Sequence, residues 1–188
     1  MVKLDKIYTK GGDRGQTSLA DGNRVDKHSL RITAQGDIDE ANAVFGVARL
    51  HVRSPGFDEI LGRVQNDMFD LGADIATPGD NPEDGNLRIR ATQVARLERE
   101  IDAVNDDLEP LKSFVLRGGS AEAAHLHLAC TVARRAERAL AALAAAERTN
   151  KQALIYLNRL SDLLFVMARQ ANDGGKSDVL WQPGMTAE

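Results

Sequence analysis

The sequence predicts an all-α fold in a single domain. Five segments place apolar residues at the spacing of a helix face, only 4% of the 188 residues are aromatic, and Ala and Leu are abundant. Small side chains let helices pack closely, and a chain of this length can bury a sizeable core. We therefore expect one helical-bundle domain over residues 1–172, followed by a C-terminal tail at residues 173–188.

The composition also indicates the cellular compartment and the kind of partner that we expect for this chain. A single cysteine, Cys130, cannot build a disulfide framework, no apolar run approaches the ~20 residues that span a bilayer, and residues 1–21 lack the apolar core of a signal peptide. We expect a reducing, cytoplasmic compartment and no membrane. Residues 1–31 carry a charge of +3, which leaves −7 for the rest. Nucleic acid is therefore not an expected partner, whereas the N-terminal segment suits a small anion.

Residues 1–36 are predicted to be a loop, because glycines interrupt a polar run that has no helical or strand period. Glycine lets backbone N–H groups turn toward a ligand, and the segment also offers hydroxyl groups and positive charge, a combination that suits a polyphosphate. These groups are Gly11, Gly12, Gly15, Thr9, Thr17, Ser18, Lys10, Arg14 and Lys27. Neither a Walker A loop nor a GxGxxG motif is present. A disordered basic arm is the alternative.

Three helices are expected next. Acidic residues at 37–40 suit a helix N-terminus and predict a first helix over residues 37–53, although Asp37, Asp39 and Glu40 could instead bind a metal. The second helix is predicted over residues 57–76, and the third over residues 91–108. We expect four polar residues off the apolar stripe of the second helix to be solvated: Asn66, Asp67, Asp70 and Asp74. Residues 77–88 concentrate Pro, Gly, Asp and Asn and are predicted to be a mobile loop.

The connection SFVLRGGS at residues 113–120 leads into the last two helices, predicted over residues 121–148 and 150–171. Its glycines allow a close approach of the chain to another group, and Ser120 suits a helix N-cap. Phe114 is either an anchor into the core or a wall of a ligand pocket. In the tail, Trp181 could dock on a neighbour.

Each of these two helices combines an apolar stripe with a polar face. A helical projection puts His127, Cys130, Arg134, Glu137 and Arg138 on one side of the fourth helix. On the fifth helix it groups Asn158, Asp162, Phe165 and Arg169. Solvated faces with salt bridges are one interpretation, and a binding site is the other. Cys130 is expected to be a buried small residue, and His28 and His51 have no recognisable partner.

Several blocks, taken together, resemble the PduO-type ATP:corrinoid adenosyltransferases. The resemblance covers roughly residues 7–170, and its blocks are YTKGGDRGQTSL, with Arg24 and Lys27, then DIDEANAVFG, FDLGADIA, FVLRGGS, TVARRAER and YLNRLSDLLFVMAR. It implies a ferritin-like five-helix bundle that assembles as a homotrimer, with ATP and cobalamin bound between adjacent subunits. It also implies alkyl transfer of the 5'-deoxyadenosyl group of ATP to reduced cobalt, which yields adenosylcobalamin and triphosphate.

The resemblance assigns roles to individual residues. The N-terminal loop would fold over ATP, with Mg²⁺ bridging the phosphates. The implied ATP-binding residues are Thr9, Lys10, Gly11, Gly12, Thr17, Ser18, Lys27, Arg134, Arg135, Glu137, Arg138 and Asn158. Phe114 would lie beneath the corrin and displace the lower axial base, so that a partner reductase can reduce four-coordinate cobalt. Asp162 would orient Asn158 or an arginine.

Two residues depart from the family pattern. Cys130 stands where the family has an arginine, which is expected to pair with the acid matching Asp39 across the subunit contact. Breaking such a pair from one side costs about 3–5 kcal/mol when the remaining charge is desolvated. Arg117 stands where the family has proline, and we expect it to loosen the turn that positions Phe114 and to crowd the corrin site. Reduced activity or weakened subunit coupling follows, and Cys130→Arg should raise turnover.

Two other functions remain open. The chain could bind ATP and cobalamin but catalyse poorly, holding the cofactor or delivering it to an adenosylcobalamin-dependent enzyme. It could also be a scaffold that acts only through protein contacts.

Overall fold

The computed structural model describes residues 7–81 and 83–186, and in these ranges it contains a short hairpin and five helices. The hairpin pairs β1 (Gln16–Ser18) with β2 (Arg24–Asp26) in antiparallel register. The helices are α1 (Leu30–Arg49), α2 (Phe57–Ala76), α3 (Ala91–Asn105), α4 (Ala121–Ala146) and α5 (Lys151–Gln170). The expected all-α fold is confirmed.

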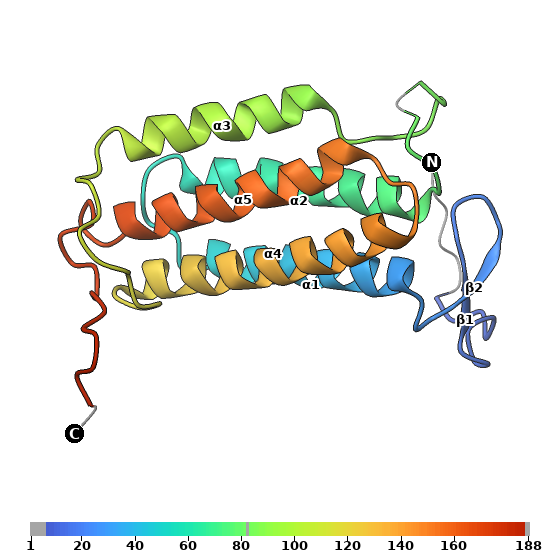
Figure 1. Cartoon of the computed structure of the whole chain (residues 1–188), viewed down its shortest axis with the longest axis horizontal. Helices are drawn as coiled ribbons and strands as arrows, with labels where there is room; N and C mark the ends of the chain where they lie inside the picture. Colours follow the sequence, from blue (N-terminus) through green and yellow to red (C-terminus); the bar gives the residue numbers. More distant parts are fainter. Residues whose placement is uncertain (1–6, 82, 187–188) are drawn as a thin grey trace.

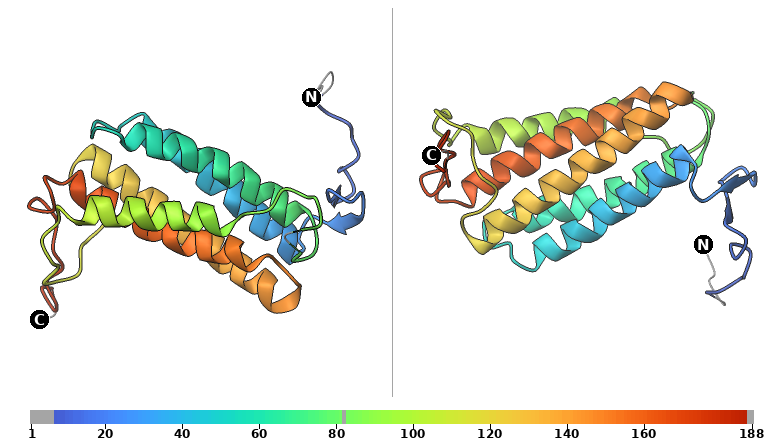
Figure 2. Two further views of the ribbon diagram at one scale, coloured as in Figure 1. Left: turned by 90° about the horizontal axis from the view of Figure 1, so that it is seen from above. Right: turned by 60° about the horizontal axis from the view of Figure 1, so that its bottom comes forward.

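The helices run alternately up and down the long axis of the molecule (Figure 1). α4 packs against both α1 and α5, α2 packs on α1, and α3 lies along α5. Figures 1 and 2 show the hairpin at one end of the bundle and the C-terminal segment at the other. The candidate site residues are therefore spread along the length of the bundle.

The apolar stripes predicted for the last two helices form the core. The residues expected on the stripe of α4 are all fully buried: Leu126, Ala129, Ala133, Ala136 and Leu140. The same holds for Leu157, Leu160, Leu164 and Ala168 on α5. Alanines at the centre of α4 leave little bulk between helices, which allows the close packing inferred from the composition.

The predicted boundaries of α2 agree with the structure, whereas those of α1 do not. α1 begins at Leu30, so residues 30–36 are helical and not loop. The buried side chain of Arg31 explains this, because its Nη1 donates to the carbonyl of Ile75 (2.6 Å) and its Nη2 pairs with Glu147 (2.6 Å). These contacts with other elements stabilise a first turn that the polar sequence does not favour. α3, α4 and α5 end one to three residues before the predicted positions, at Asn105, Ala146 and Gln170.

Two acidic residues of α2 that were expected in solvent are buried. Asp67 is 7% exposed and Asp74 is 1% exposed. Asp67 accepts hydrogen bonds from the Tyr156 hydroxyl (2.9 Å) and from Gln93 Nε2 (3.0 Å), and it pairs with Arg96. Burial, followed by the nearby Asp67 carboxylate, raises the pKa of Tyr156 well above its ordinary value. The expectation of solvation was wrong because α3 and α5 cover Asp67, while the chain segments that lead into these two helices cover Asp74.

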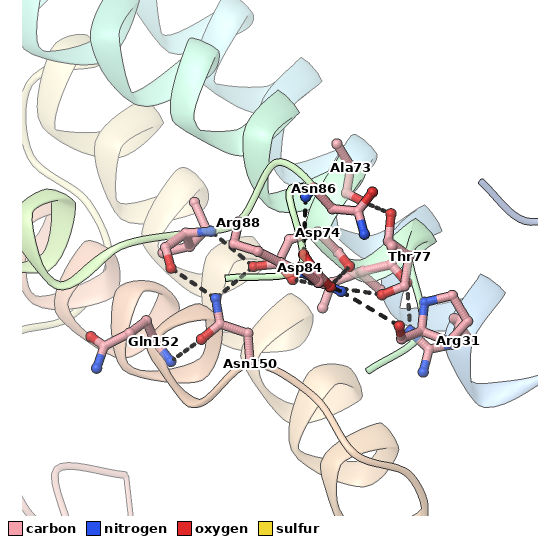
Figure 3. A network of polar contacts seen from close by, with 12 residues as sticks. Arg31, Ala73, Asp74, Thr77, Asp84, Asn86, Arg88, Asn150 and Gln152 are labelled. Atoms are coloured by element: carbon pink, nitrogen blue, oxygen red, sulfur yellow. Dashed lines mark hydrogen bonds and ion pairs between the residues drawn. The ribbon is translucent and has the colours of Figure 1, made fainter. Parts of the chain in front are cut away.

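Asp74 is the centre of a buried polar network (Figure 3). Its Oδ1 accepts from Arg88 Nη1 (2.9 Å), while its Oδ2 accepts from the Ile89 N–H (2.8 Å) and from Asn150 Nδ2 (2.7 Å). Arg88 also donates to Asp84 (2.6 Å). The C-terminal end of the loop at residues 77–88 is thus fastened to α2 and to the start of α5.

The tail folds back on the protein. Residues 179–181 run antiparallel to residues 114–116, with an isolated bridge between Val115 and Leu180. Trp181 lies against Phe114 of its own chain, at 5.9 Å between ring centroids. Within the described ranges, no helix is long and apolar enough to cross a membrane.

Candidate functional site

The N-terminal loop is held against the hairpin by Arg24. Its Nη2 donates to the carbonyl of Gly11 (2.6 Å) and its Nη1 donates to Ser18 Oγ (3.2 Å). Lys10 adopts a positive φ of 59°, which a residue with a side chain rarely takes. The exposed loop therefore has a defined course and is not a free arm in the residues described.

Gly12 makes room for Lys27. A Cβ at Gly12 would lie 2.8 Å from Lys27 Nζ and 3.1 Å from its Cε. The Lys27 N–H donates to the carbonyl of Gly15 (2.9 Å), so the backbone of the lysine is fastened to the loop. Any side chain at residue 12 would displace the ammonium group.

A cavity of about 410 Å³ lies between the hairpin and α1. Its lining brings Thr17 and Lys27 together with Asp39. Burial raises the pKa of the Asp39 carboxyl, and among residues 7–81 and 83–186 this carboxylate makes no ion pair. Three of the predicted site residues, Thr17, Lys27 and Asp39, thus line one cavity.

A second group of predicted residues meets on the faces of α4 and α5. Glu137 accepts a hydrogen bond from Asn158 Nδ2 (2.9 Å), and Asn158 Oδ1 accepts from Arg159 Nη1 (2.6 Å). Arg134 and Arg138 are exposed one turn apart, and Arg138 Nη1 donates to the backbone carbonyl of Arg134 (3.1 Å). This arrangement offers two guanidinium groups beside a carboxylate–amide pair. The sequence analysis did not identify Arg159, because its hydrogen bond to Asn158 shows only in the folded chain.

Asp162 lies near the same group. Burial raises the pKa of its carboxyl, Arg159 and Arg134 lower it, and Glu137 raises it. These influences place Asp162 within electrostatic reach of the predicted α4 residues. In the described ranges no hydrogen bond joins Asp162 to Asn158, so its predicted orienting role is not seen in the single chain.

Arg135 does not join this group. It forms an ion pair with Glu40 of α1 and lies 3.9 Å from Asp37 Oδ1. One residue after Arg134 the helix has turned by about 100°, which directs Arg135 toward α1. The role of Arg135 in binding ATP stays a prediction, since in the single chain this arginine is directed toward α1. Asp37 and Glu40 serve as partners of this arginine.

His127 and Cys130 are buried and not on a charged face. Their residues are 0% and 2% exposed, and Cys130 Sγ donates to the carbonyl of Ser161 (3.2 Å). The two-sided projection failed because α4 lies between α1 and α5 and so buries more than one stripe. Burial raises the pKa of the Cys130 thiol, which agrees with a buried, unreactive cysteine.

Phe114 is presented to solvent and does not anchor the core, since it is 76% exposed. Its segment is held in place by the tail: the Trp181 N–H donates to the Phe114 carbonyl (2.8 Å), and the Leu116 N–H donates to the Val179 carbonyl (2.7 Å). This pairing could not be predicted, because residues 173–188 show neither helical nor strand periodicity.

The side chain of Arg117 is held by residues of α4 and α5. Its guanidinium lies over the Phe165 ring, 5.3 Å from the centroid, and its Nη1 is 3.3 Å from His127 Nδ1. Stacking on an aromatic ring gives the guanidinium a fixed place. The expectation that Arg117, in place of the family's proline, loosens the turn and crowds the corrin site stays a prediction.

One further pairing was not foreseen. His51, which was left without a partner, stacks on His125 with 3.8 Å between ring centroids and 9° between ring planes. The contact joins the C-terminal end of α1 to the first turns of α4.

Comparisons with known proteins bear on this arrangement. The family model for cobalamin adenosyltransferase matches residues 7–171. The corrinoid adenosyltransferase of Mycobacterium leprae is 48% identical, over 97% of this chain and 98% of that protein. That of Bacillus subtilis is 42% identical, over 89% of this chain and 86% of that protein.

Solved structures agree. One is a phenylalanine-to-alanine variant of the PduO-type ATP:corrinoid adenosyltransferase from Lactobacillus reuteri, complexed with cobalamin and ATP. It superimposes with a TM-score of 0.87 at 36% identity, over 94% of this chain and 99% of that one. An arginine-to-lysine variant of the Lactobacillus reuteri enzyme, complexed with ATP, gives a TM-score of 0.85 at 36% identity, over 94% of this chain and 100% of that one.

Proposed function

Because the chain belongs to the cobalamin adenosyltransferase family, we propose that it transfers the 5'-deoxyadenosyl group of ATP to the cobalt of reduced cobalamin. The observation that carries the proposal is the cluster on α4 and α5, where Arg134 and Arg138 stand beside the Glu137–Asn158 pair. Forked guanidinium groups bind two phosphate oxygens at once and stabilise charge on a leaving triphosphate.

The N-terminal loop would hold the phosphates. Its exposed backbone and hydroxyl groups are the donors that a polyphosphate needs, and Lys27 adds charge. The residues concerned are Thr9, Lys10, Gly11, Gly12, Thr17, Ser18 and Lys27. The part of the chain that the structure describes has no group of three or more His, Cys, Asp or Glu side chains arranged for a metal ion. Mg²⁺ would therefore be held through phosphate oxygens, where it would neutralise charge on the triphosphate.

Phe114 would serve the second substrate. An exposed aromatic ring on a braced segment can cover the lower face of the corrin and exclude an axial ligand, which makes reduction of cob(II)alamin by a partner reductase easier. The cobalt electron pair then forms the bond to the 5' carbon as the bond from that carbon to the triphosphate oxygen breaks. The protein's tasks are alignment and charge stabilisation, and little proton transfer is required.

We further propose a homotrimer in the cytoplasm, with the site between subunits. The hairpin and the cavity beside Asp39 belong to one region of the chain, and the Arg134 cluster belongs to another, on the faces of α4 and α5. A neighbouring copy would bring these two regions together. The product would pass to an adenosylcobalamin-dependent enzyme.

The visible spectrum of cob(II)alamin mixed with the protein and Mg-ATP tests the proposal. We expect the band of four-coordinate, base-off cobalt, followed by adenosylcobalamin when a reductant is added. No spectral change with either reagent would overturn the proposed activity.

A holding or delivery role is the second candidate, and the Asp39 carboxylate favours it. This acid is partly desolvated, and Cys130 stands where the family has the arginine expected to pair with it across the subunit contact. A four-coordinate band without product after reduction would support this role over catalysis.

Gly12→Ala tests the loop. The new Cβ displaces the flexible end of Lys27, so we expect the Kd for ATP to rise about tenfold, the effect of losing roughly 1.4 kcal/mol of binding. Calorimetric titration with Mg-ATP measures it. Gly72→Ala in α2 is the matched control, because its Cβ meets no atom within 4 Å. Unchanged ATP affinity in Gly12→Ala would remove Lys27 from the phosphate site.

The two departures from the family pattern are expected to be coupled. Arg117 Nη1 lies 3.3 Å from His127 Nδ1, one turn before Cys130. Burial raises the pKa of the Cys130 thiol, and the positive charge of Arg117 opposes this rise. Cys130→Arg would therefore bring two like charges together, and we expect it to raise turnover more when Arg117→Pro is also present. A double-mutant cycle on kcat should give a coupling of about 0.5–3 kcal/mol. Additive effects would show that the two positions are independent.

A further inference from the structure

A buried ion pair lies at the end of α5 that is remote from the Figure 3 network. Arg169 Nε donates to Asp178 Oδ2 (2.9 Å), and the two side chains are 7% and 2% exposed. Arg169 Nη2 also donates to the Glu109 carbonyl (2.9 Å), in the connection that follows α3. Buried pairs contribute little net stability on average, so their better-supported use is to fix one arrangement of the chain.

Asn172 extends this pair to the connection that carries Phe114. Its side chain accepts from the Ser120 N–H (2.9 Å) and donates to the Gly118 carbonyl (3.1 Å) and to Asp178 Oδ1 (3.2 Å). The residue is only 1% exposed. Both polar atoms of the Asn172 side-chain amide thus form hydrogen bonds, and two of these bonds join the backbone on either side of Gly119.

The absence of a side chain at Gly119 allows the Asn172 amide to approach the backbone this closely. A Cβ at this position would lie 2.2 Å from Asn172 Oδ1, and its φ of 108° also disfavours any other residue. The sequence prediction that the glycines let the chain pass close to another group is confirmed here. The group is the Asn172 amide.

The same tail then pairs with the Phe114 segment. Besides the two backbone bonds at Phe114 and Leu116, Ser113 Oγ donates to the Trp181 carbonyl (3.0 Å). The backbone around Phe114 is therefore fixed from both sides while the ring itself remains largely exposed. Because its backbone is already ordered, the Phe114 ring loses little conformational entropy when a ligand packs on it.

We propose that Asn172 and Asp178 are positioning residues for Phe114. They touch neither substrate, and they act through the backbone of residues 113–120 and the tail. This inference rests on the proposed function, in which Phe114 covers the lower face of the corrin.

The test measures the four-coordinate cob(II)alamin band with Mg-ATP, ATP affinity and the Tm. In Asn172→Ala we expect the band to be lost and kcat to fall by about 100-fold, the effect of misplacing a reacting group by roughly 1 Å. ATP affinity should not change. Asp178→Asn, which keeps the shape of the side chain, should show the same pattern. Ser113→Ala removes only a surface contact of the tail and should show an intermediate loss.

The chain provides a matched control at its other end. Asn150 also joins a buried arginine–aspartate pair, Arg88 and Asp74, and it is remote from Phe114. Asn150→Ala should lower the Tm as Asn172→Ala does, but it should keep the band. If Asn172→Ala and Asp178→Asn keep the band while their Tm falls, these residues only stabilise the fold, and the inference is wrong. If the unmodified protein shows no band, the proposed function itself fails.

Discussion

Arg134→Lys is expected to lower kcat by about 100- to 1,000-fold, as removal of a fixed donor from a transition state does in other enzymes. Lysine keeps the positive charge but loses the planar fork that binds two phosphate oxygens. We therefore expect the KM for ATP to change little, because charge alone attracts the nucleotide. Arg134 is exposed and its backbone is fixed within α4, so the fold should not change.

Single-turnover formation of adenosylcobalamin from chemically reduced cobalamin measures this effect, because it bypasses the reductase. Arg53→Lys is the control, since this arginine lies at the surface and, among the described residues, donates to the carbonyls of Leu50 and Val52. A rate within a few-fold of the unmodified protein in Arg134→Lys would mean that the leaving triphosphate is stabilised by another cation, with Arg138 as the first candidate.

Asp74→Ala is expected to lower the free energy of unfolding by about 3 kcal/mol, because it removes the more deeply buried of the two carboxylates that pair with Arg88 and leaves only Asp84. The Ile89 N–H and Asn150 Nδ2 lose their shared acceptor as well. For a chain of this size the Tm should fall by roughly 10 °C.

Urea unfolding followed by circular dichroism measures the change. The double variant Asp74→Leu with Arg88→Met should lose less stability than Asp74→Ala, since no charge then remains buried alone. Asp58→Ala, which breaks an exposed pair with Arg49, should leave the Tm unchanged. Equal losses in Asp74→Ala and in the double variant would show that the network acts through packing and not through charge.

Local sequence patterns predicted most of the fold. The bounds of α2 and the apolar stripes of α4 and α5 follow from helical periodicity, which reports one buried face of one helix. The start of α1 could not be predicted in this way, because Arg31 holds its first turn through contacts with residues far along the chain. Asp67 and Asp74 were missed for the same reason.

The site was predicted less completely than the fold. Glu137 and Asn158 were placed together correctly, and Thr17, Lys27 and Asp39 line one cavity. The ion pair between Arg135 and Glu40 could not be predicted, because it depends on which helix covers which face of α4. The contacts of Asn172 with Gly118 and Ser120, and of Trp181 with Phe114, could not be predicted, since these partners are more than fifty residues away along the chain.

The central place of α4 also determines how the chain can fold. α1 with α2, and α4 with α5, are neighbours in sequence that pack on each other, so each pair can form as a local helical hairpin. The packing of α1 on α4 joins the two hairpins across a long stretch of chain and must wait for that loop to close. We therefore expect docking of these hairpins, and not helix formation, to limit the folding rate.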